Sequence, residues 1–408
     1  MRVLEGIRVL DVTMWGFVPA AGGILADWGA TVIKVEHPDR GDPVRGLISS
    51  SMAGNGFPIL WEIPNRGKKS VGIDLAVPEG REVLYRLVKT CDVFITSFLP
   101  AARRRLGIDK GDIWEQNPRI VYARGSGQGV RGPESERGGW DLSTFWSRGG
   151  AAAMTTSPGA TTPTRIPAAA YGDLTSGMAL AGAVAAALVQ QARTGEGVAV
   201  DVSLLNTSMW AMSSAIASSN LFGPPPNLQT PIVEQAPRPA VGNPLTAPYR
   251  TKDGRFLALY VPSNQQWIEL CGALGEPGLV DDPRFVDEAS RVANNADCYP
   301  ILEEIFLRRT LDEWRTALEP IEAVWGAVQF PDELLTDPQV LANGYMGEIE
   351  KTFEGRPVKL VTNPAQFNEE PPELGVAPEL GEHTDEVLMD IGLTSDELTD
   401  LKVKGAIL

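Results

Sequence analysis

Residues 7–36 have the sequence IRVLDVTMWGFVPAAGGILADWGATVIKVE, and this stretch decides the fold class. Two runs rich in β-branched residues, 7–13 and 31–36, flank a segment of small residues that we expect to form a helix ending near Trp28. Further β-branched runs follow at 70–75 (SVGIDL), 92–97 (DVFITS) and 119–125 (RIVYARG). Strands that alternate with helices indicate a doubly wound, mostly parallel sheet. The sequence therefore predicts an α/β fold whose large domain is Rossmann-like.

The domain organisation follows from the length and from one break in this alternation. A chain of 408 residues is too long for a single core, so we expect more than one compact unit. A Pro-rich stretch from Gly223 to Pro248 predicts a linker. Beyond it, a hairpin around Asp253–Gly254 and helices near 264–274, 299–308 and 311–320 predict a smaller, inserted α+β domain. The predicted order is the first part of the large domain at 1–222, the linker and small domain at 223–330, and the return to the large domain at 331–408.

The composition argues against several classes of ligand and site. There are 36 Lys and Arg residues against 52 Asp and Glu residues, a formal net charge of −16, which disfavours binding to nucleic acid or to anionic membranes. Cys91, Cys271 and Cys298 show no spacing typical of disulfides or zinc sites, so we expect buried thiols and no metal. The N-terminus has no signal-peptide pattern, and the most apolar run, 178–189, is shorter than a bilayer span of about 20 residues. We therefore expect a cytoplasmic protein.

Several well-known catalytic motifs are missing from the sequence. Residues 127–132, GQGVRG, match the dinucleotide pattern GxGxxG, but the following PESERGG does not open the helix that would receive a pyrophosphate. The loop after the first strand, TMWGFVPAAGG, lacks this fingerprint as well. There is no GxSxG, GxxxxGK[ST] or HExxH pattern, and His37 and His383 are the only histidines. If the protein is an enzyme, a carboxylate or a lysine must carry the chemistry.

One acid stands out as a candidate for that chemistry. Asp173 precedes a run of small residues in YGDLTSGMALAGAVAAALVQ, 171–190, and two roles are open for it, the N-cap of a helix and a catalytic group. Because hardly any residue of this helix is bulky, we expect it to pack on all sides, with Asp173 inside a site. Basic segments at 37–46, 65–70 and 102–107 fall near predicted strand ends and indicate a phosphate-rich ligand.

Taken in order, the segments of the chain resemble the family III CoA-transferases, a group related to the 2-methylacyl-CoA racemases. The resemblance rests on LEGIRVLDVT, GATVIKVEHPDRGDPVR, NRGKKSVGIDL, NPRIVYARGSGQG, YGDLTSGM, GEGVAVDVSLL, YRTKDGRFLAL and GEHTDEVL. It implies a Rossmann-like large domain, a small inserted domain and a homodimer of two interlocked chains. It also implies an exchange of CoA between an acyl-CoA and a free carboxylic acid, with coenzyme A as substrate and no prosthetic group, ATP or metal.

The resemblance also implies roles for individual residues. Asp173 matches the catalytic aspartate, whose carboxylate would attack the thioester, form a mixed anhydride and then carry CoA as an enzyme-bound thioester. Asp141 matches an acidic position of the transferases and would orient the acceptor acid or modulate Asp173. CoA contacts are expected at His37, Arg40, Lys68, Lys69, Ser97 and Arg105, and substrate-pocket positions at Gly16, Trp140 and Phe145. Gly16 stands where the formyl-CoA enzyme has a glutamine, which argues against formate or oxalate as a substrate.

Two alternatives to CoA transfer stay open. A racemase needs an acid and a base on opposite faces of the α-carbon, and the racemases pair their aspartate with a histidine where this chain has Trp140. An indole N–H has no useful proton-transfer pKa, so Trp140 favours CoA transfer. The other alternative is a non-catalytic protein that binds CoA. The large apolar residues Trp140, Phe145, Trp146 and Met154 indicate either a pocket for an apolar or bulky acyl group or ordinary core packing.

Overall fold

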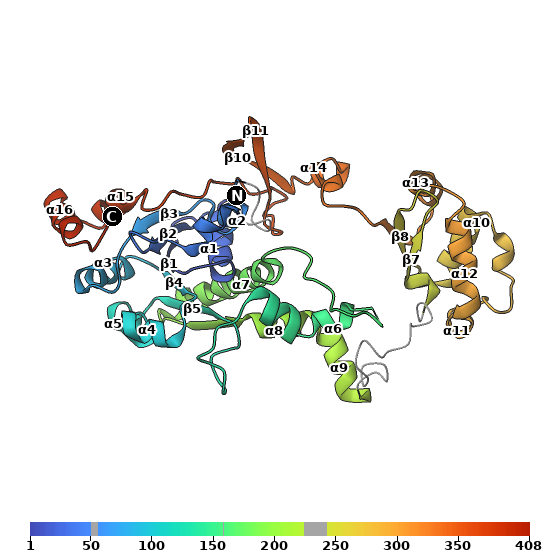
Figure 1. Cartoon of the computed structure of the whole chain (residues 1–408), viewed down its shortest axis with the longest axis horizontal. Helices are drawn as coiled ribbons and strands as arrows, with labels where there is room; N and C mark the ends of the chain where they lie inside the picture. Colours follow the sequence, from blue (N-terminus) through green and yellow to red (C-terminus); the bar gives the residue numbers. More distant parts are fainter. Residues whose placement is uncertain (50–55, 158, 224–242) are drawn as a thin grey trace. The chain divides into compact units, whose positions relative to one another are not determined.

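The computed structural model describes residues 1–49, 56–157, 159–223 and 243–408. The chain divides into two compact units, a larger one of Met1–Ile232 with Gln339–Leu408 and a smaller one of Val233–Pro338 (Figure 1). Two stretches that are far apart in the sequence thus form the larger unit. Residues 224–242 of the predicted linker lie outside the described residues.

A six-stranded sheet forms the centre of the larger unit (Figure 1). Its strands are β1 (Arg8–Val12), β2 (Thr31–Glu36), β3 (Lys69–Gly72), β4 (Val93–Thr96), β5 (Val121–Ser126) and β6 (Ala199–Ser203). The strand order is β3-β2-β1-β4-β5-β6, and every neighbouring pair is parallel. This is the strand order of a Rossmann fold. The predicted α/β class with a parallel sheet is confirmed.

Helices cover both faces of this sheet. One face carries α1 (Phe17–Asp27) and α7 (Tyr171–Thr194), and the other carries α3 (Pro78–Val88), α5 (Lys110–Gln116), α15 (Thr384–Asp390) and α16 (Ser395–Val403). Side chains of β1 alternate between the faces, since Val9 packs with α1 and α7 while Leu10 packs with α3 and α15. The sheet is therefore buried on both sides, as is usual for parallel sheets.

Small residues let α1 approach its neighbours closely. A Cβ atom on Gly177 of α7 would lie 3.0 Å from the Phe17 carbonyl oxygen of α1. A Cβ atom on Gly23 would lie 2.8 Å from the Pro64 carbonyl oxygen of α2 (Ile59–Asn65). The helix ends at Trp28, its C-cap, which confirms the predicted helix of small residues.

The burial of α7 differs from the prediction that it packs on all sides. The helix has 24 residues, of which one face is buried against α1 and the sheet. The opposite face is exposed along its length, at Thr175, Ala179, Gly182 and Ala186. By length and composition α7 could also cross a membrane, which corrects the expectation that this run is too short, but its buried face belongs to the core of the larger unit.

The smaller unit combines a three-stranded antiparallel sheet with helices. Its elements are β7 (Pro248–Arg250), β8 (Phe256–Tyr260), α10 (Asn264–Leu274), α11 (Glu288–Ala293), α12 (Asn295–Phe306), α13 (Leu311–Leu318) and β9 (Val324–Ala327). The hairpin turns at Asp253–Gly254, where Gly254 has φ 78°. The predicted hairpin and helices of this unit are confirmed. Cys271 and Cys298 are buried free thiols here, as is Cys91 in the larger unit.

The remaining elements complete the two units. The helices and strands are α4 (Pro100–Leu106), α6 (Ala151–Thr155), α8 (Leu204–Ala211), α9 (Ser213–Phe222), α14 (Pro338–Ala342), β10 (Met346–Phe353) and β11 (Arg356–Val361). A π-helix, η2 (Asp141–Arg148), and the short 3-10 helices η1 (Pro43–Ser49), η5 (Pro244–Thr246), η6 (Pro277–Leu279) and η7 (Glu333–Leu335) lie between them. A capping box formed by Thr394 and Glu397 begins α16.

Candidate active site

A pocket of about 540 Å³ lies at the carboxyl end of the parallel sheet. The pocket is lined by residues of the loops after β1 and β4, by the end of β5 and by the starts of α7 and α8. β1 and β4 are neighbours from which the chain continues toward opposite edges of the sheet. Such a switch point is where open α/β sheets bind their ligands. The predicted site residues that line this pocket are Gly16, Ser97, Arg105, Trp140 and Asp173.

Asp173 is the third residue of α7, and its carboxylate faces the start of α1. A Cβ atom at Gly16, the residue before α1, would lie 2.5 Å from Asp173 Oδ2, so any side chain at this position would displace the carboxylate. Within the described part of the chain, no group donates a hydrogen bond to it. Burial, with a smaller contribution from the charge of Asp141, raises the pKa of Asp173 to about 7. Asp173 is thus a half-buried acid that titrates near neutral pH.

Of the two roles that the sequence left open for Asp173, it does not take that of the N-cap, because another acid satisfies the start of α7. The N-cap of α7 is Ala170, which has φ 61° and makes no side-chain capping bond. Instead, Asp141 Oδ1 accepts a hydrogen bond of 2.8 Å from the Gly172 N–H. Burial raises the pKa of Asp141, and the hydrogen bonds from the backbone of Gly172 and Tyr171 oppose that rise. Asp141 therefore satisfies the start of α7 from outside the helix.

The π-helix η2 brings Asp141 to this position. π-turns are rare and occur often at functional sites. Phe145, one turn into η2, packs directly on Gly172, where any side chain would collide with its ring. Phe145 is buried and does not line the pocket, so it supports the start of α7 from behind.

Two tryptophans form an aromatic wall of the pocket. The rings of Trp15 and Trp140 meet edge to face with their centroids 4.8 Å apart. Trp140 is 56% exposed, which rules out the core-packing alternative for this side chain. Trp15 has φ 74°, a conformation that residues other than glycine rarely adopt. Sequence reasoning missed Trp15, and only its place in the loop after the first predicted strand could have marked it.

The arginines that line the pocket differ in their pairing. Four of them form ion pairs: Arg103 with Asp109, Arg104 with Glu136, Arg124 with Asp201, and Arg137 with Glu134. Arg105 lines the pocket without an ion pair in the described ranges of the chain. It is therefore the pocket arginine that an anionic ligand would meet uncompensated. Ser97 lines the pocket too, and its Oγ accepts a hydrogen bond of 2.8 Å from the Met14 N–H.

Lys68 and Lys69 lie away from the pocket. The Lys68 ammonium is buried 2.7 Å from Asp11 Oδ2, so it is used inside the protein and does not face a surface ligand. Burial lowers the pKa of Lys68 to about 8. The Lys69 ammonium lies 2.6 Å from Glu386 Oε1. Both lysines stand at the beginning of β3, whereas the pocket lies where the strands end, and this explains why they are not brought together with Arg105.

His37 and Arg40 follow β2 at the correct edge of the sheet, but neither lines the pocket. His37 Nδ1 accepts a hydrogen bond of 3.2 Å from the Asp39 N–H, and His37 Nε2 lies 3.8 Å from the Asp74 carboxylate. Arg40 is exposed in the turn after β2. His37 and Arg40 are therefore not among the residues that line the pocket with Asp173.

The glycine-rich segment after β5 contributes to the pocket in a way that sequence reasoning missed. Gly127 and Gly139 cross so closely that a Cβ atom on Gly127 would lie 2.5 Å from Gly139 Cα. The structure describes every residue from Gly127 to Gly139, and no helix begins among them. GQGVRG is therefore not a dinucleotide-binding loop. Arg124, at the end of β5, was missed as well. The available signal was their position at the end of a predicted strand.

Comparisons with known proteins give matches over nearly the whole chain. The sequence model described as CoA-transferase family III matches residues 4–384. The chain is 32% identical over 406 residues to (R)-2-hydroxy-4-methylpentanoate CoA-transferase of Clostridioides difficile, covering 98% of each protein. It is 30% identical to cinnamoyl-CoA:phenyllactate CoA-transferase of Clostridium sporogenes, covering 98% of this chain and 96% of that protein. It is also 30% identical to human succinyl-CoA:glutarate CoA-transferase, covering 96% and 86%.

Solved structures show the same similarity in three dimensions. Rv3272 from Mycobacterium tuberculosis matches with a TM-score of 0.81 and 28% sequence identity, covering 94% of this chain and 98% of that one. A CAIB/BAIF family protein from Brucella suis matches with a TM-score of 0.77 and 27% identity, covering 95% and 99%. The α/β fold described above is therefore shared with these proteins.

Proposed function

The chain belongs to CoA-transferase family III and is a CoA-transferase, and on this premise we propose that Asp173 is its nucleophile. The enzyme moves CoA from an acyl-CoA to a carboxylic acid. One observation carries the proposal: the Asp173 carboxylate faces the pocket, receives no hydrogen bond from the described residues and titrates near pH 7. A carboxylate that is weakly solvated in the free enzyme has little solvation left to lose when it attacks.

The proposed reaction has balanced steps. An Asp173 oxygen attacks the thioester carbon, the C–S bond breaks, and CoA leaves as a thiolate while a mixed anhydride forms. The thiolate then attacks the Asp173 carbonyl carbon and releases the donor acid as a carboxylate. The resulting aspartyl-CoA thioester is attacked by the acceptor carboxylate, and the same two steps run in reverse to give the new acyl-CoA. One thioester replaces another, so the exchange is nearly even in free energy.

The start of α1 is suited to stabilise the negative charge that develops on the attacked carbonyl oxygen. The N–H groups of Phe17 and Val18, the first residues of α1, have no partner within the helix. The amino end of the helix dipole is positive and lies next to the Asp173 carboxylate. Donors that are already in place when charge develops lower the barrier more than groups that must reorient.

We assign the phosphates of CoA to the arginine-rich side of the pocket, with Arg105 as the first contact. A phosphate there meets a guanidinium that has no competing carboxylate among the described residues. The Ser97 hydroxyl is engaged with Met14, so its contribution is to hold the loop after β1. Lys68 is excluded from this set by its internal pairing with Asp11.

The acyl group is proposed to be apolar or bulky, as the residues near Asp173 favour. Trp15, Trp140 and Leu204 line the pocket with the carboxylate. The names of the relatives include acids with a branched or aromatic side chain, (R)-2-hydroxy-4-methylpentanoate and phenyllactate, and the dicarboxylic acid glutarate. A second carboxylate would need an unpaired cation beside the tryptophans to replace its hydration.

We also propose that two copies of the chain form the active enzyme. α8 and α9 expose large apolar side chains, with Trp210 80%, Leu221 71% and Phe222 84% exposed. Apolar residues gathered in this way indicate a surface that an assembly covers. Light scattering is expected to give twice the chain mass of 43.9 kDa, and a monomer at micromolar concentration would contradict the proposal.

Chemical trapping tests the role of Asp173. The wild-type protein is incubated with an acyl-CoA in the presence of hydroxylamine, and peptides are analysed by mass spectrometry. We expect a hydroxamate on Asp173 only under turnover, since only an activated acyl group reacts. The same reaction in D₂O separates the racemase alternative: deuterium at the α-carbon without exchange of CoA would refute transfer.

A further inference from the structure

We infer that the buried Lys34–Asp42 ion pair positions the loop after β1 and thereby sets the acyl specificity of the site. Lys34 and Asp42 are positioning residues, and Trp15 is the specificity-determining residue that they hold. The inference rests on the proposed function, because it concerns the acyl group that Asp173 receives.

The loop Thr13–Gly16 is held in a conformation that its own residues disfavour. Trp15 has φ 74°, where any side chain is strained. Five described residues other than glycine have positive φ, and two of them lie beside Asp173: Trp15 precedes Gly16, and Ala170 precedes α7. Strain retained on both sides of a reactive group indicates that surrounding contacts override the local preference.

One buried ion pair, Lys34–Asp42, holds this loop through two hydrogen bonds to its backbone. Asp42 Oδ1 accepts a hydrogen bond of 3.2 Å from the Trp15 N–H. Lys34 Nζ donates a hydrogen bond of 3.1 Å to the Thr13 carbonyl oxygen. The Lys34 ammonium and the Asp42 carboxylate lie 3.0 Å apart, and both side chains are fully buried. The backbone on either side of Met14 is therefore fixed by the same pair of charges.

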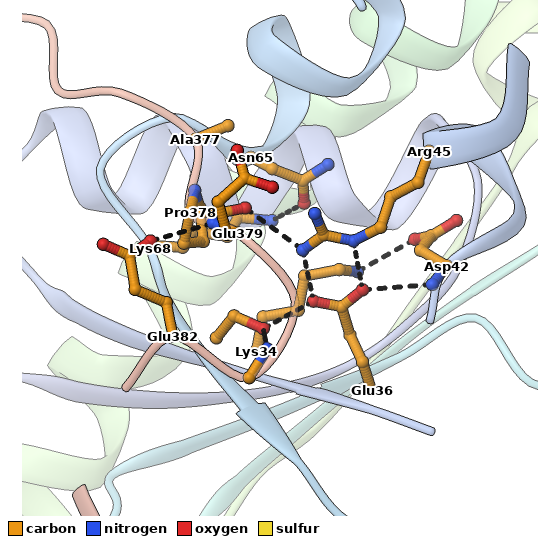
Figure 2. A network of polar contacts seen from close by, with 12 residues as sticks. Lys34, Glu36, Asp42, Arg45, Asn65, Lys68, Ala377, Pro378, Glu379 and Glu382 are labelled. Atoms are coloured by element: carbon orange, nitrogen blue, oxygen red, sulfur yellow. Dashed lines mark hydrogen bonds and ion pairs between the residues drawn. The ribbon is translucent and has the colours of Figure 1, made fainter. Parts of the chain in front are cut away.

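A second pair keeps the first one in place. Figure 2 shows Lys34 and Asp42 in one network with Glu36 and Arg45. Glu36 Oε2 accepts a hydrogen bond of 3.0 Å from the Asp42 N–H, and Arg45 lies 2.8 Å from the Glu36 carboxylate. Burial disfavours the charged form of Lys34, but the surrounding carboxylates, Asp42 first, outweigh it and raise the pKa of Lys34. The ammonium therefore stays charged at neutral pH.

Stability alone does not explain such a pair. Apolar residues of similar volume often replace a buried ion pair at no loss of stability. What apolar residues do not supply is a donor and an acceptor at fixed positions. In this loop those two groups hold the backbone on both sides of Met14.

The position of this loop decides where two walls of the pocket lie. The Gly16 backbone borders the Asp173 carboxylate, and the Trp15 ring meets Trp140 at 4.8 Å. If Trp15 relaxed to negative φ, its ring and the Gly16 peptide would both move away from the acyl group. A flat or branched apolar acyl group would lie along the tryptophan wall. We therefore name aryl and branched-chain monocarboxylic acids as the substrate class.

The first experiment replaces Trp15 by glycine and leaves the buried charges intact. Trp15→Gly removes the ring, and glycine adopts φ 74° without strain, so we expect the variant to fold, with a melting temperature lowered by the lost packing of the ring against Trp61 and Trp140. We expect its kcat/KM ratio for an aryl or branched acyl-CoA over acetyl-CoA to fall by about tenfold or more. An unchanged ratio would overturn the inference.

The second experiment removes the Lys34–Asp42 ion pair and keeps Trp15. Lys34→Met/Asp42→Leu replaces the ion pair by apolar residues of similar volume. We expect kcat for the preferred acyl-CoA to fall by about tenfold to hundredfold and the same selectivity ratio to fall. The Kd of free CoA should change by less than about twofold, because the arginine side of the pocket is untouched. A loss of folded protein would instead lower kcat for every acyl-CoA by the same factor and leave KM and the selectivity ratio unchanged.

A matched control comes from the other end of α1. Asp27 and Arg66 form an ion pair of 2.6 Å, with side chains 1% and 5% exposed. Asp27→Leu/Arg66→Met is expected to alter thermal stability and leave selectivity unchanged. Equal losses of selectivity in both double variants would overturn the inference. Absence of transfer by the wild type across a panel of acyl-CoAs and acids would overturn the proposed function as well, whereas transfer with unchanged selectivity in Trp15→Gly overturns the inference alone.

Discussion

Charged residues gather both at the start of α7 and at the start of β3, and the two regions use them differently. At β3, Lys68 is neutralised by Asp11, and Lys69 by Glu386. At α7, Asp173 receives no hydrogen bond from the described residues. Besides burial, what shifts its pKa is the charge of Asp141, which is also negative. Charges that neutralise each other are engaged inside the protein and are not available to a ligand. A charge without such a partner, beside a pocket, has a perturbed pKa and is available for chemistry.

Asp173→Asn would break the α7 side of this comparison with the largest effect. The amide cannot attack a thioester, so we expect kcat to fall by at least about 10⁴-fold. Kinetics with a sensitive assay for CoA exchange would measure it. Transfer at more than a few per cent of the wild-type rate would show that another group is the nucleophile.

The same variant tests the buried charge through stability. The folded-state pKa of Asp173 is about 7, above the ordinary value near 4. The folded state therefore binds the proton more tightly than the unfolded state, and wild-type stability falls as pH rises from about 4 to about 7. Asp173→Asn lacks this loss, so we expect a higher melting temperature than wild type at pH 8.

Lys68→Met would break the β3 side, and its effect is on folding. The substitution leaves the Asp11 carboxylate buried without its partner, for which we expect a loss of about 3–5 kcal/mol in the free energy of unfolding. Urea denaturation measures this loss. Adding Asp11→Asn should recover much of it, since the double variant has no unpaired buried charge. An unchanged free energy of unfolding together with a raised KM for acyl-CoA would instead show that Lys68 contacts the ligand.

Arg105→Met and Lys69→Met sharpen the comparison at the level of CoA binding. Removing the unpaired pocket guanidinium is expected to raise KM for acyl-CoA about tenfold with little change in kcat, as for a phosphate contact made equally in the ground and transition states. Lys69→Met is expected to change KM by less than about twofold, because Lys69 pairs with Glu386 outside the pocket. Equal increases for the two variants would mean that CoA reaches the start of β3.

Asp141→Asn is expected to have the smallest effect, on the pH profile. The amide oxygen can still accept the Gly172 N–H, so the start of α7 should hold, while the negative charge that raises the pKa of Asp173 is removed. Activity requires ionised Asp173 and rises with pH around 7. The midpoint of this rise should move to lower pH by less than about one unit. A shift to higher pH would contradict the proposed influence of Asp141.

Much of the fold could be predicted from local patterns. The β-branched runs at 7–13, 31–36, 70–75, 92–97 and 119–125 correspond to the first five strands, because strand preference and side-chain periodicity are properties of a few neighbouring residues. The helix of small residues up to Trp28 and the hairpin at Asp253–Gly254 were predictable for the same reason. The exposed face of α7 was not, since the residues of both faces are equally small.

The site was predictable in part. Asp173 belongs to a segment that carries the family resemblance, Gly16 and Trp140 stand where relatives have a glutamine or a histidine, and all three line one pocket. Trp15 escaped notice because a positive φ has no local sequence signature when the residue is not glycine. Lys34 and Asp42 escaped it because a lysine within a strand pattern gives no indication that its ammonium is buried against a carboxylate.

The sequence by itself determined the parallel sheet, the alternation of strands and helices along the chain, the family, and the acid at the start of α7. Only the tertiary structure decided which charges are neutralised. Asp141 reaches Gly172 across 31 residues of chain, and Lys68 reaches Asp11 across 57. Backbone preferences act over a few residues and leave a trace in the sequence, whereas hydrogen bonds and ion pairs depend on distances that exist only after the chain has folded.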